Sequence, residues 1–226
     1  MTTMHSEEIN RIATTVAPYT MTLPQGVNEL VRLVQRAIEY KISGAFVECG
    51  VWRGGSMMAI AMALRSLGVD DRELYLFDTF EGMTPPEPVD IDLNGAAAIV
   101  RFNQEKTRGD KTTWCYAPLD DVKARMASTN YPTERIHYVV GKVEETLPPK
   151  EPKKIAILRL DTDFYSSTKH ELETMYPRIS HGGVVIIDDY GHWRGSKKAT
   201  DEYLEQHAPD LALLECGYSV RIGIKP

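Results

Sequence analysis

The chain has 226 residues and a formal net charge of −6, from 26 lysines and arginines against 32 aspartates and glutamates. This length suits a single α/β domain with a sizeable core. No basic stripe marks a nucleic-acid-binding surface, and the longest apolar run, residues 57–64, is too short to span a bilayer. We therefore expect neither a nucleic-acid nor a membrane partner.

The N-terminal sequence and the cysteines indicate the cellular compartment in which we expect the protein. The first ten residues, MTTMHSEEIN, carry acids where a signal peptide has basic and then apolar residues. Cys49, Cys115 and Cys216 are far apart and form no CxxC pair. Scattered cysteines in odd number fit a reducing cytoplasm and argue against a zinc site built on cysteine.

Strand-like and helix-like segments alternate along the chain, which indicates one α/β domain over residues 1–226 with helices on both faces of a mostly parallel sheet. A helical segment, residues 1–41, comes first, and we expect its outer face to pair with a second copy in a homodimer. Apolar runs predict five strands, at residues 45–49, 73–77, 136–140, 155–160 and 184–187.

Helices are expected between these strands, where apolar residues recur at helical spacing. Ser56 is placed to cap the first of them, which ends at Gly68. Others are expected at residues 119–126, around Leu172, and around Tyr203. The segment around Gly217 reads as an antiparallel hairpin that completes a seven-stranded sheet.

Residues 82–118 interrupt this alternation with a long irregular segment that includes TPPEPVDIDLNG and KTTWCYAP. Such a loop in a compact domain is usually a binding loop or lid, and otherwise disordered. It follows the second strand, so it can fold over the carboxyl edge of the sheet. We interpret it as a lid or insertion.

Four acids follow two buried strands: Asp161 and Asp163 in IAILRLDTDFY, and Asp188 and Asp189 in GGVVIIDDY. The carboxyl ends of parallel strands are where ligands bind, and adjacent strands lie roughly 5 Å apart. Converging carboxylates repel one another unless a cation neutralises them, and their hard oxygens suit Mg²⁺ or a related ion. The alternative is that these acids are solvated and only end the strands.

A glycine-rich turn, Glu48-Cys-Gly50-Val-Trp-Arg-Gly-Gly-Ser56, follows the first strand, and Asp78 ends the second. The turn lacks the GxGxxG spacing of dinucleotide-binding folds, and Glu48 would repel a pyrophosphate. A carboxylate there suits the amino group and sulfonium of S-adenosylmethionine, and Asp78 is placed to bind ribose hydroxyls. These features favour S-adenosylmethionine over NAD.

The segments VECGVWRGGS, LFDTFEGM, GKVEETLP, LRLDTDFYSST and IDDYGHWRG resemble the macrocin O-methyltransferase family, which methylates sugar hydroxyls of macrolide and aminocoumarin antibiotics. The resemblance covers roughly residues 19–205. It implies a Rossmann-like, class I S-adenosylmethionine methyltransferase fold, dependence on Mg²⁺, and a small-molecule acceptor that contains a sugar.

The resemblance also assigns residues. It implies that the metal ligands are Asp161, Asp188 and Asp189, and that Asp163 is the general base. It places six residues in the cofactor site: Thr20, Glu48, Gly50, Ser56, Asp78 and Val143.

The chemistry of the acids agrees with a methyl transfer. A divalent cation at an acceptor hydroxyl lowers its pKa. Asp163 lies two residues beyond Asp161 and, in an extended segment, shares its face and can accept the proton. The alternative for Asp163 is a supporting role that orients a ligand. His192 and Trp193 follow the second acidic pair and are candidates for substrate contact or, equally, for loop packing.

Two other functions remain open from the sequence. A catechol-type O-methyltransferase can use a similar carboxylate-bound metal to chelate an aromatic diol. A non-catalytic module can bind S-adenosylmethionine without turnover, although cofactor binding alone does not require the second acidic pair.

Overall fold

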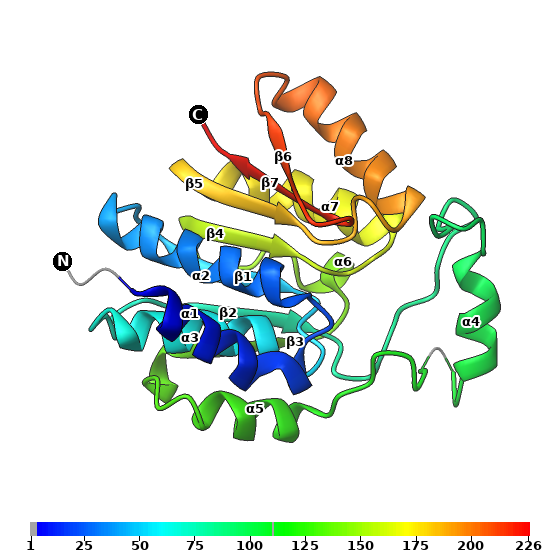
Figure 1. Ribbon diagram of the computed structural model, residues 1–226. Helices are drawn as coiled ribbons and strands as arrows, with labels where there is room; N and C mark the ends of the chain where they lie inside the picture. Colours follow the sequence, from blue (N-terminus) through cyan, green and yellow to red (C-terminus); the bar gives the residue numbers. More distant parts are fainter. Residues whose placement is uncertain (1–3, 110) are drawn as a thin grey trace.

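The computed structural model describes residues 4–109 and 111–226, and its strands form one seven-stranded sheet in the order β3-β2-β1-β4-β5-β7-β6 (Figure 1). The strands are β1 Ala45–Cys49, β2 Leu74–Asp78, β3 Ile136–Val140, β4 Ile155–Leu160, β5 Ile179–Ile187, β6 Leu213–Cys216 and β7 Val220–Ile224. Strands β1 to β5 pair in parallel, whereas β7 pairs antiparallel with both β5 and β6. The predicted parallel sheet and its C-terminal hairpin are therefore confirmed.

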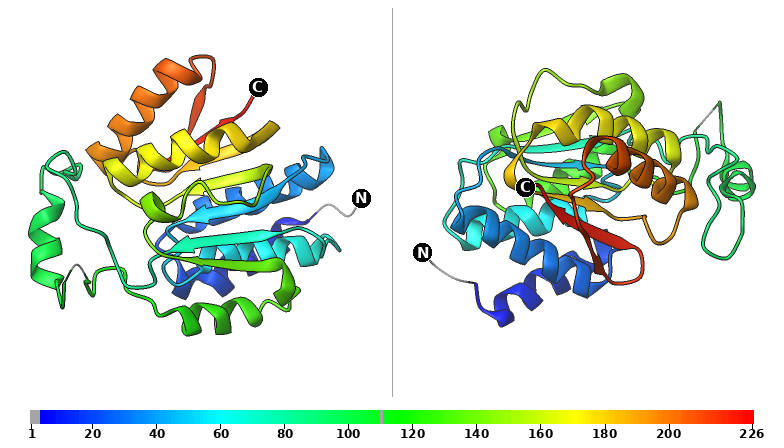
Figure 2. Two further views of the ribbon diagram at one scale, coloured as in Figure 1. Left: turned by 180° about the vertical axis from the view of Figure 1, so that it is seen from behind. Right: turned by 90° about the horizontal axis from the view of Figure 1, so that it is seen from above.

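Helices cover both faces of the sheet. They are α1 Ser6–Val16, α2 Pro24–Glu39, α3 Gly55–Ser66, α4 Ala98–Glu105, α5 Leu119–Ala127, α6 Val143–Thr146, α7 Tyr165–Met175 and α8 Arg194–His207. One core cluster joins α1, α2, α3 and α5 to the sheet, and a second joins α6, α7 and α8 to its other face (Figure 2). None of the helices in residues 4–109 and 111–226 is both long enough and apolar enough to cross a membrane.

Local differences from the predicted elements have simple causes. Strand β5 begins at Ile179, five residues before the predicted start. The prediction missed its first half because the residues there, Ser-His-Gly-Gly, do not form an apolar run. Ser56 does not cap α3. The cap is Gly54, whose φ of +85° is left-handed and favours glycine, and no side chain bonds to the helix end.

Apart from one helix, the described part of segment 82–118 is mostly irregular, as predicted, and residue 110, like residues 1–3 of the predicted helical segment, lies outside the described residues. The segment contains α4, a helix that the sequence pattern did not predict. Helix α4 lies beyond the carboxyl ends of β2 and β4 (Figure 1). A third cluster of buried rings and methyl groups holds the segment to the main body: Ala98, Phe102, Trp114, Phe164 and Trp193. The segment therefore covers the carboxyl edge, whereas its opening as a lid stays a prediction.

The chain reverses its direction of winding between β1 and β4, which pair with each other while β2 lies on the outer side of β1. In open α/β sheets this is where the crevice for ligands forms. Gly50 follows β1 with a φ of +80°, and a Cβ on it would lie 2.0 Å from the carbonyl oxygen of Asp161. Only glycine lets the two strand ends approach so closely.

Candidate active site

A buried arginine joins the acids at the carboxyl edge of the sheet. The side chain of Arg159 is 2% exposed. Its guanidinium donates to Glu48 Oε1 at 2.5 Å, to Asp188 Oδ1 at 2.5 Å, and to Asp161. It also donates to Thr22 Oγ1 at 2.8 Å, in the segment that leads into α2. One side chain thus binds three acids and the N-terminal part of the chain.

Strand register explains this convergence. Arg159 on β4 lies directly opposite Glu48 on β1 and Ile186 on β5. Side chains two residues apart point to the same face of a strand. Asp161 and Asp188 each follow such a position by two residues, so the β-alternation directs both carboxylates toward the side of the sheet that carries the guanidinium.

Three of the four predicted aspartates form a group suited to a metal ion. Asp161, Asp163 and Asp189 each offer a carboxylate oxygen within 4.8 Å of the others. Oδ2 of Asp189 is buried and has no hydrogen-bond partner among the described residues. An oxygen in that state is stabilised by a cation. Asp188 lies beside this group and uses Oδ1 on Arg159.

Asp163 is held in an unusual conformation. Its φ is +70°, so the segment after Asp161 turns back rather than continuing as the extended chain that we predicted. The turn brings a carboxylate oxygen of Asp163 to within 4.8 Å of carboxylate oxygens of Asp161 and Asp189. Burial and the charge of Asp161 raise the pKa of Asp163 to about 7, against a hydrogen bond from Trp193.

Two adjoining hollows meet at these acids. The first is bordered by the ends of β1 and β2 and by the start of α6, and the second by the segment before α2, the insertion and the β6–β7 turn. Asp161 and Asp163 line both hollows, whereas Asp188 and Asp189 line the second. The arrangement gives room for two ligands, with the acids between them.

The residues predicted for cofactor binding divide between the hollows. Gly50, Asp78 and Val143 line the first, and Thr20 and Ser56 line the second. Oδ2 of Asp78 accepts hydrogen bonds from the backbone N–H groups of Val51 at 2.8 Å and Trp52 at 3.0 Å. Asp78 therefore also fixes the turn after β1.

Glu48 lines neither hollow, because it is 1% exposed within β1. Burial raises the pKa of Glu48 to about 7, although the charge of Arg159 opposes this shift. Its Oε2 is buried without a hydrogen-bond partner among the described residues. Glu48 therefore lies buried within β1, and not on the exposed surface of the glycine-rich turn.

Sequence reasoning missed Arg159. A signal was available: an arginine inside the apolar run IAILRL can be buried only with acidic partners, and Glu48 occupies the corresponding position of the neighbouring strand.

Comparison with known proteins identifies the family of the chain. The family model of the macrocin O-methyltransferases (TylF) matches residues 5–215. The chain is 33% identical over 172 residues to the 8-demethyl-8-(2,3-dimethoxy-alpha-L-rhamnosyl)-tetracenomycin-C 4'-O-methyltransferase of Streptomyces olivaceus, covering 76% of this chain and 62% of that protein. It is 29% identical over 197 residues to the mycinamicin III 3''-O-methyltransferase of Micromonospora griseorubida, covering 87% and 74%.

The fold has a counterpart among solved structures. The O-methyltransferase NovP superposes with a TM-score of 0.83 at 24% identity, over 97% of this chain and 96% of that one. The predicted class I methyltransferase fold is thereby confirmed. The chain spans 62% of the length of the Streptomyces olivaceus relative. The match over residues 5–215 shows that the chain belongs to the macrocin O-methyltransferase family.

Proposed function

We propose that this chain transfers a methyl group from S-adenosylmethionine to a sugar hydroxyl of a natural-product glycoside, with the help of Mg²⁺. The observation that carries the proposal is the meeting of two hollows at one cluster of aspartates. A methyl transfer needs two bound molecules whose reacting atoms face each other. The name of the Streptomyces olivaceus relative includes a rhamnosyl group, which supports a sugar as acceptor.

We assign the first hollow to the cofactor. Its wall combines the close backbone approach at Gly50, the carboxylate of Asp78 and the buried Val143 at the start of α6. A carboxylate suits ribose hydroxyls, and an apolar side chain suits the adenine ring. The proposed cofactor site also includes Thr20 and Ser56, which line the adjoining second hollow. It includes Glu48 as well, which is buried and would act through its charge.

We assign the acids to the cation and the proton. The donor set consists of carboxylate oxygens, which Mg²⁺ prefers, and the buried unpaired Oδ2 of Asp189 fits such an ion. We propose Asp161, Asp188 and Asp189 as ligands. The compact group of Asp161, Asp163 and Asp189 favours an alternative in which Asp163 is itself a ligand, and the two assignments are separated below.

When bound, S-adenosylmethionine supplies the methyl group and the cation lowers the pKa of the acceptor hydroxyl. The residues of the chain do the rest. Asp163, whose carboxylate lies within 4.8 Å of those of Asp161 and Asp189, is placed to accept the hydroxyl proton. Two residues of the insertion, Trp114 and Cys115, line the second hollow and reduce the access of water to it.

The first test is transfer of a labelled methyl group to a rhamnoside and, in parallel, to a catechol. We expect product from the rhamnoside, loss of turnover in EDTA and recovery with Mg²⁺. Transfer to the catechol alone would reject the sugar assignment. Full turnover after exhaustive dialysis against EDTA would reject the cation.

A second prediction concerns Asp163. Asp163→Asn should lower kcat by about 10²–10⁴-fold, the usual range for loss of a general base, while the Mg²⁺ concentration for half-maximal activity stays unchanged. Asp188→Asn is the control, because loss of a ligand should raise that concentration. If excess Mg²⁺ rescues Asp163→Asn, Asp163 is a ligand and the base assignment is wrong.

A third prediction follows from the raised pKa of Asp163. Its pKa of about 7 in the folded state lies above the roughly 3.9 of an unfolded aspartate. Between these values the folded state binds more protons at Asp163, so this residue should make stability fall as pH rises from about 4 to about 7, and its own contribution is at most about 1.4 kcal/mol per unit. Thermal unfolding without a divalent ion measures this slope. Asp163→Asn should flatten it, and an unchanged slope in that variant contradicts the assignment.

A further inference from the structure

Rings from three separate segments line one side of the second hollow. Trp114 comes from the insertion, His192 and Trp193 from the segment after β5, and Tyr218 from the β6–β7 turn. Their centroids follow one another at 6.0 Å from Trp114 to Trp193, 4.9 Å from Trp193 to His192 and 6.0 Å from His192 to Tyr218. The rings thus form a continuous wall beside the four aspartates.

The rings differ in what they can offer to a ligand. Trp114 is 3% exposed and Trp193 is 8% exposed, because both belong to the cluster that holds the insertion in place. Tyr218 is 58% exposed. The tryptophans are therefore committed to packing, whereas Tyr218 lines the hollow and remains more than half exposed.

Tyr218 is exposed but held in place. Its hydroxyl lies 3.2 Å from Nδ1 of His192. The N–H of Gly191 donates to the carbonyl of Ser219 at 2.8 Å. A Cβ on Gly191 would lie 2.0 Å from the carbonyl oxygen of Tyr218, so the turn rests directly on the segment that follows the second acidic pair. An exposed ring fixed in this way binds a ligand with little loss of side-chain entropy.

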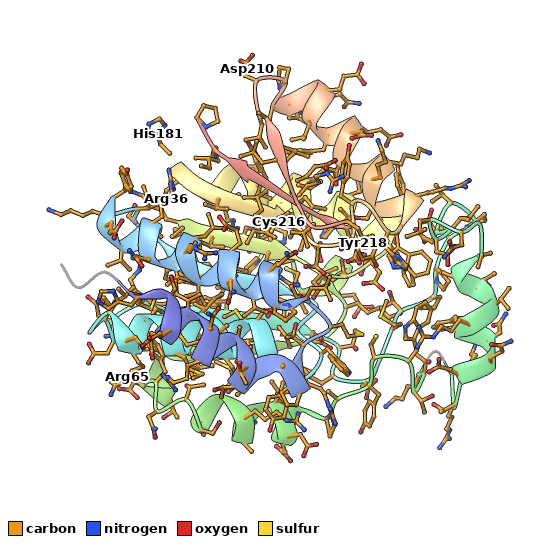
Figure 3. All side chains as sticks on the ribbon, in the orientation of Figure 1. Arg36, Arg65, His181, Asp210, Cys216 and Tyr218 are labelled. Carbon is orange, nitrogen blue, oxygen red and sulfur yellow. The ribbon has the colours of Figure 1, made fainter. Side chains whose placement is uncertain are left out.

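The neighbourhood of Tyr218 matches the two faces of a pyranose. A sugar ring has an apolar C–H face, which packs on the negatively polarised face of an aromatic ring, and hydroxyl edges that bond to carboxylates. Tyr218 and the four aspartates line the same hollow. Figure 3 places Tyr218 at the end of the hairpin on the side of the sheet toward α4.

We propose that Tyr218, anchored by His192, is a specificity-determining residue that stacks on the acceptor sugar and presents its hydroxyl groups to the aspartates. This inference rests on the proposed function and adds to it the residue that selects and orients the sugar ring. Trp193, a candidate for substrate contact from the sequence, packs instead in the cluster that holds the insertion.

Methyl α-L-rhamnopyranoside is the suitable probe, because it has no aromatic aglycone that could stack in place of the sugar. Tyr218→Ala should raise KM for this probe roughly three- to tenfold, the range expected for loss of one stacking contact. Tyr218→Trp should keep KM near the wild-type value. In each variant, affinity for S-adenosylhomocysteine should stay within twofold, because Tyr218 does not line the first hollow.

Tyr40→Ala is the matched control. Tyr40 is a 69% exposed tyrosine whose ring lies 5.2 Å from Cζ of Arg36, and Figure 3 shows Arg36 at the opposite end of the sheet from Tyr218. This variant should leave KM unchanged. If Tyr218→Ala behaves like Tyr40→Ala while the wild type methylates the probe, the inference is wrong and the proposed function stands. If the wild type transfers no methyl group to any sugar, both are overturned.

Discussion

The guanidinium of Arg159 is the interaction on which the site depends. Without it, the strand ends would bring several carboxylates into a space where their mutual repulsion opposes folding. A buried charge is tolerated only with partners, and removing one partner of a buried ion pair costs about 3–5 kcal/mol. Arg159 has three acidic partners, on β1, β4 and β5. The arginine thus makes possible an acidic centre inside a sheet that is otherwise apolar.

The balance of charge then explains why the centre suits a cation. Five acids surround or adjoin the guanidinium: Glu48, Asp161, Asp163, Asp188 and Asp189. One arginine does not neutralise them: burial first, and then repulsion from the neighbouring carboxylates, raises the pKa values of Asp161, Asp163 and Asp189. A divalent ion would remove this repulsion, so stability and the proposed catalysis depend on the same cluster.

The sheet and the acids could be predicted because their signals are local. Apolar runs that stop at Asp161 and Asp188 identify buried strands and the edge at which ligands bind. The positions of Thr20 and Val143 came only from family resemblance, since neither residue type implies a cofactor. Helix α4 was missed because its buried residues, Ala98 and Phe102, are too few to give a periodic pattern. The left-handed turn at Asp163 and the partners of Arg159 depend on contacts between distant segments, which no local pattern contains.

The most direct test of this account is Mn²⁺ binding, followed by electron paramagnetic resonance, to Arg159→Lys. Lysine keeps the positive charge but loses the planar fork that holds Asp161 and Asp188 together. Arg72→Lys is the control, because Arg72 is a partly buried arginine that donates to the carbonyls of Ile42 and Gly44, away from the acids. With the fold confirmed by circular dichroism, we predict at least a tenfold loss of Mn²⁺ affinity in Arg159→Lys and none in Arg72→Lys. Wild-type Mn²⁺ affinity in a folded Arg159→Lys variant would contradict the claim that Arg159 organises the site.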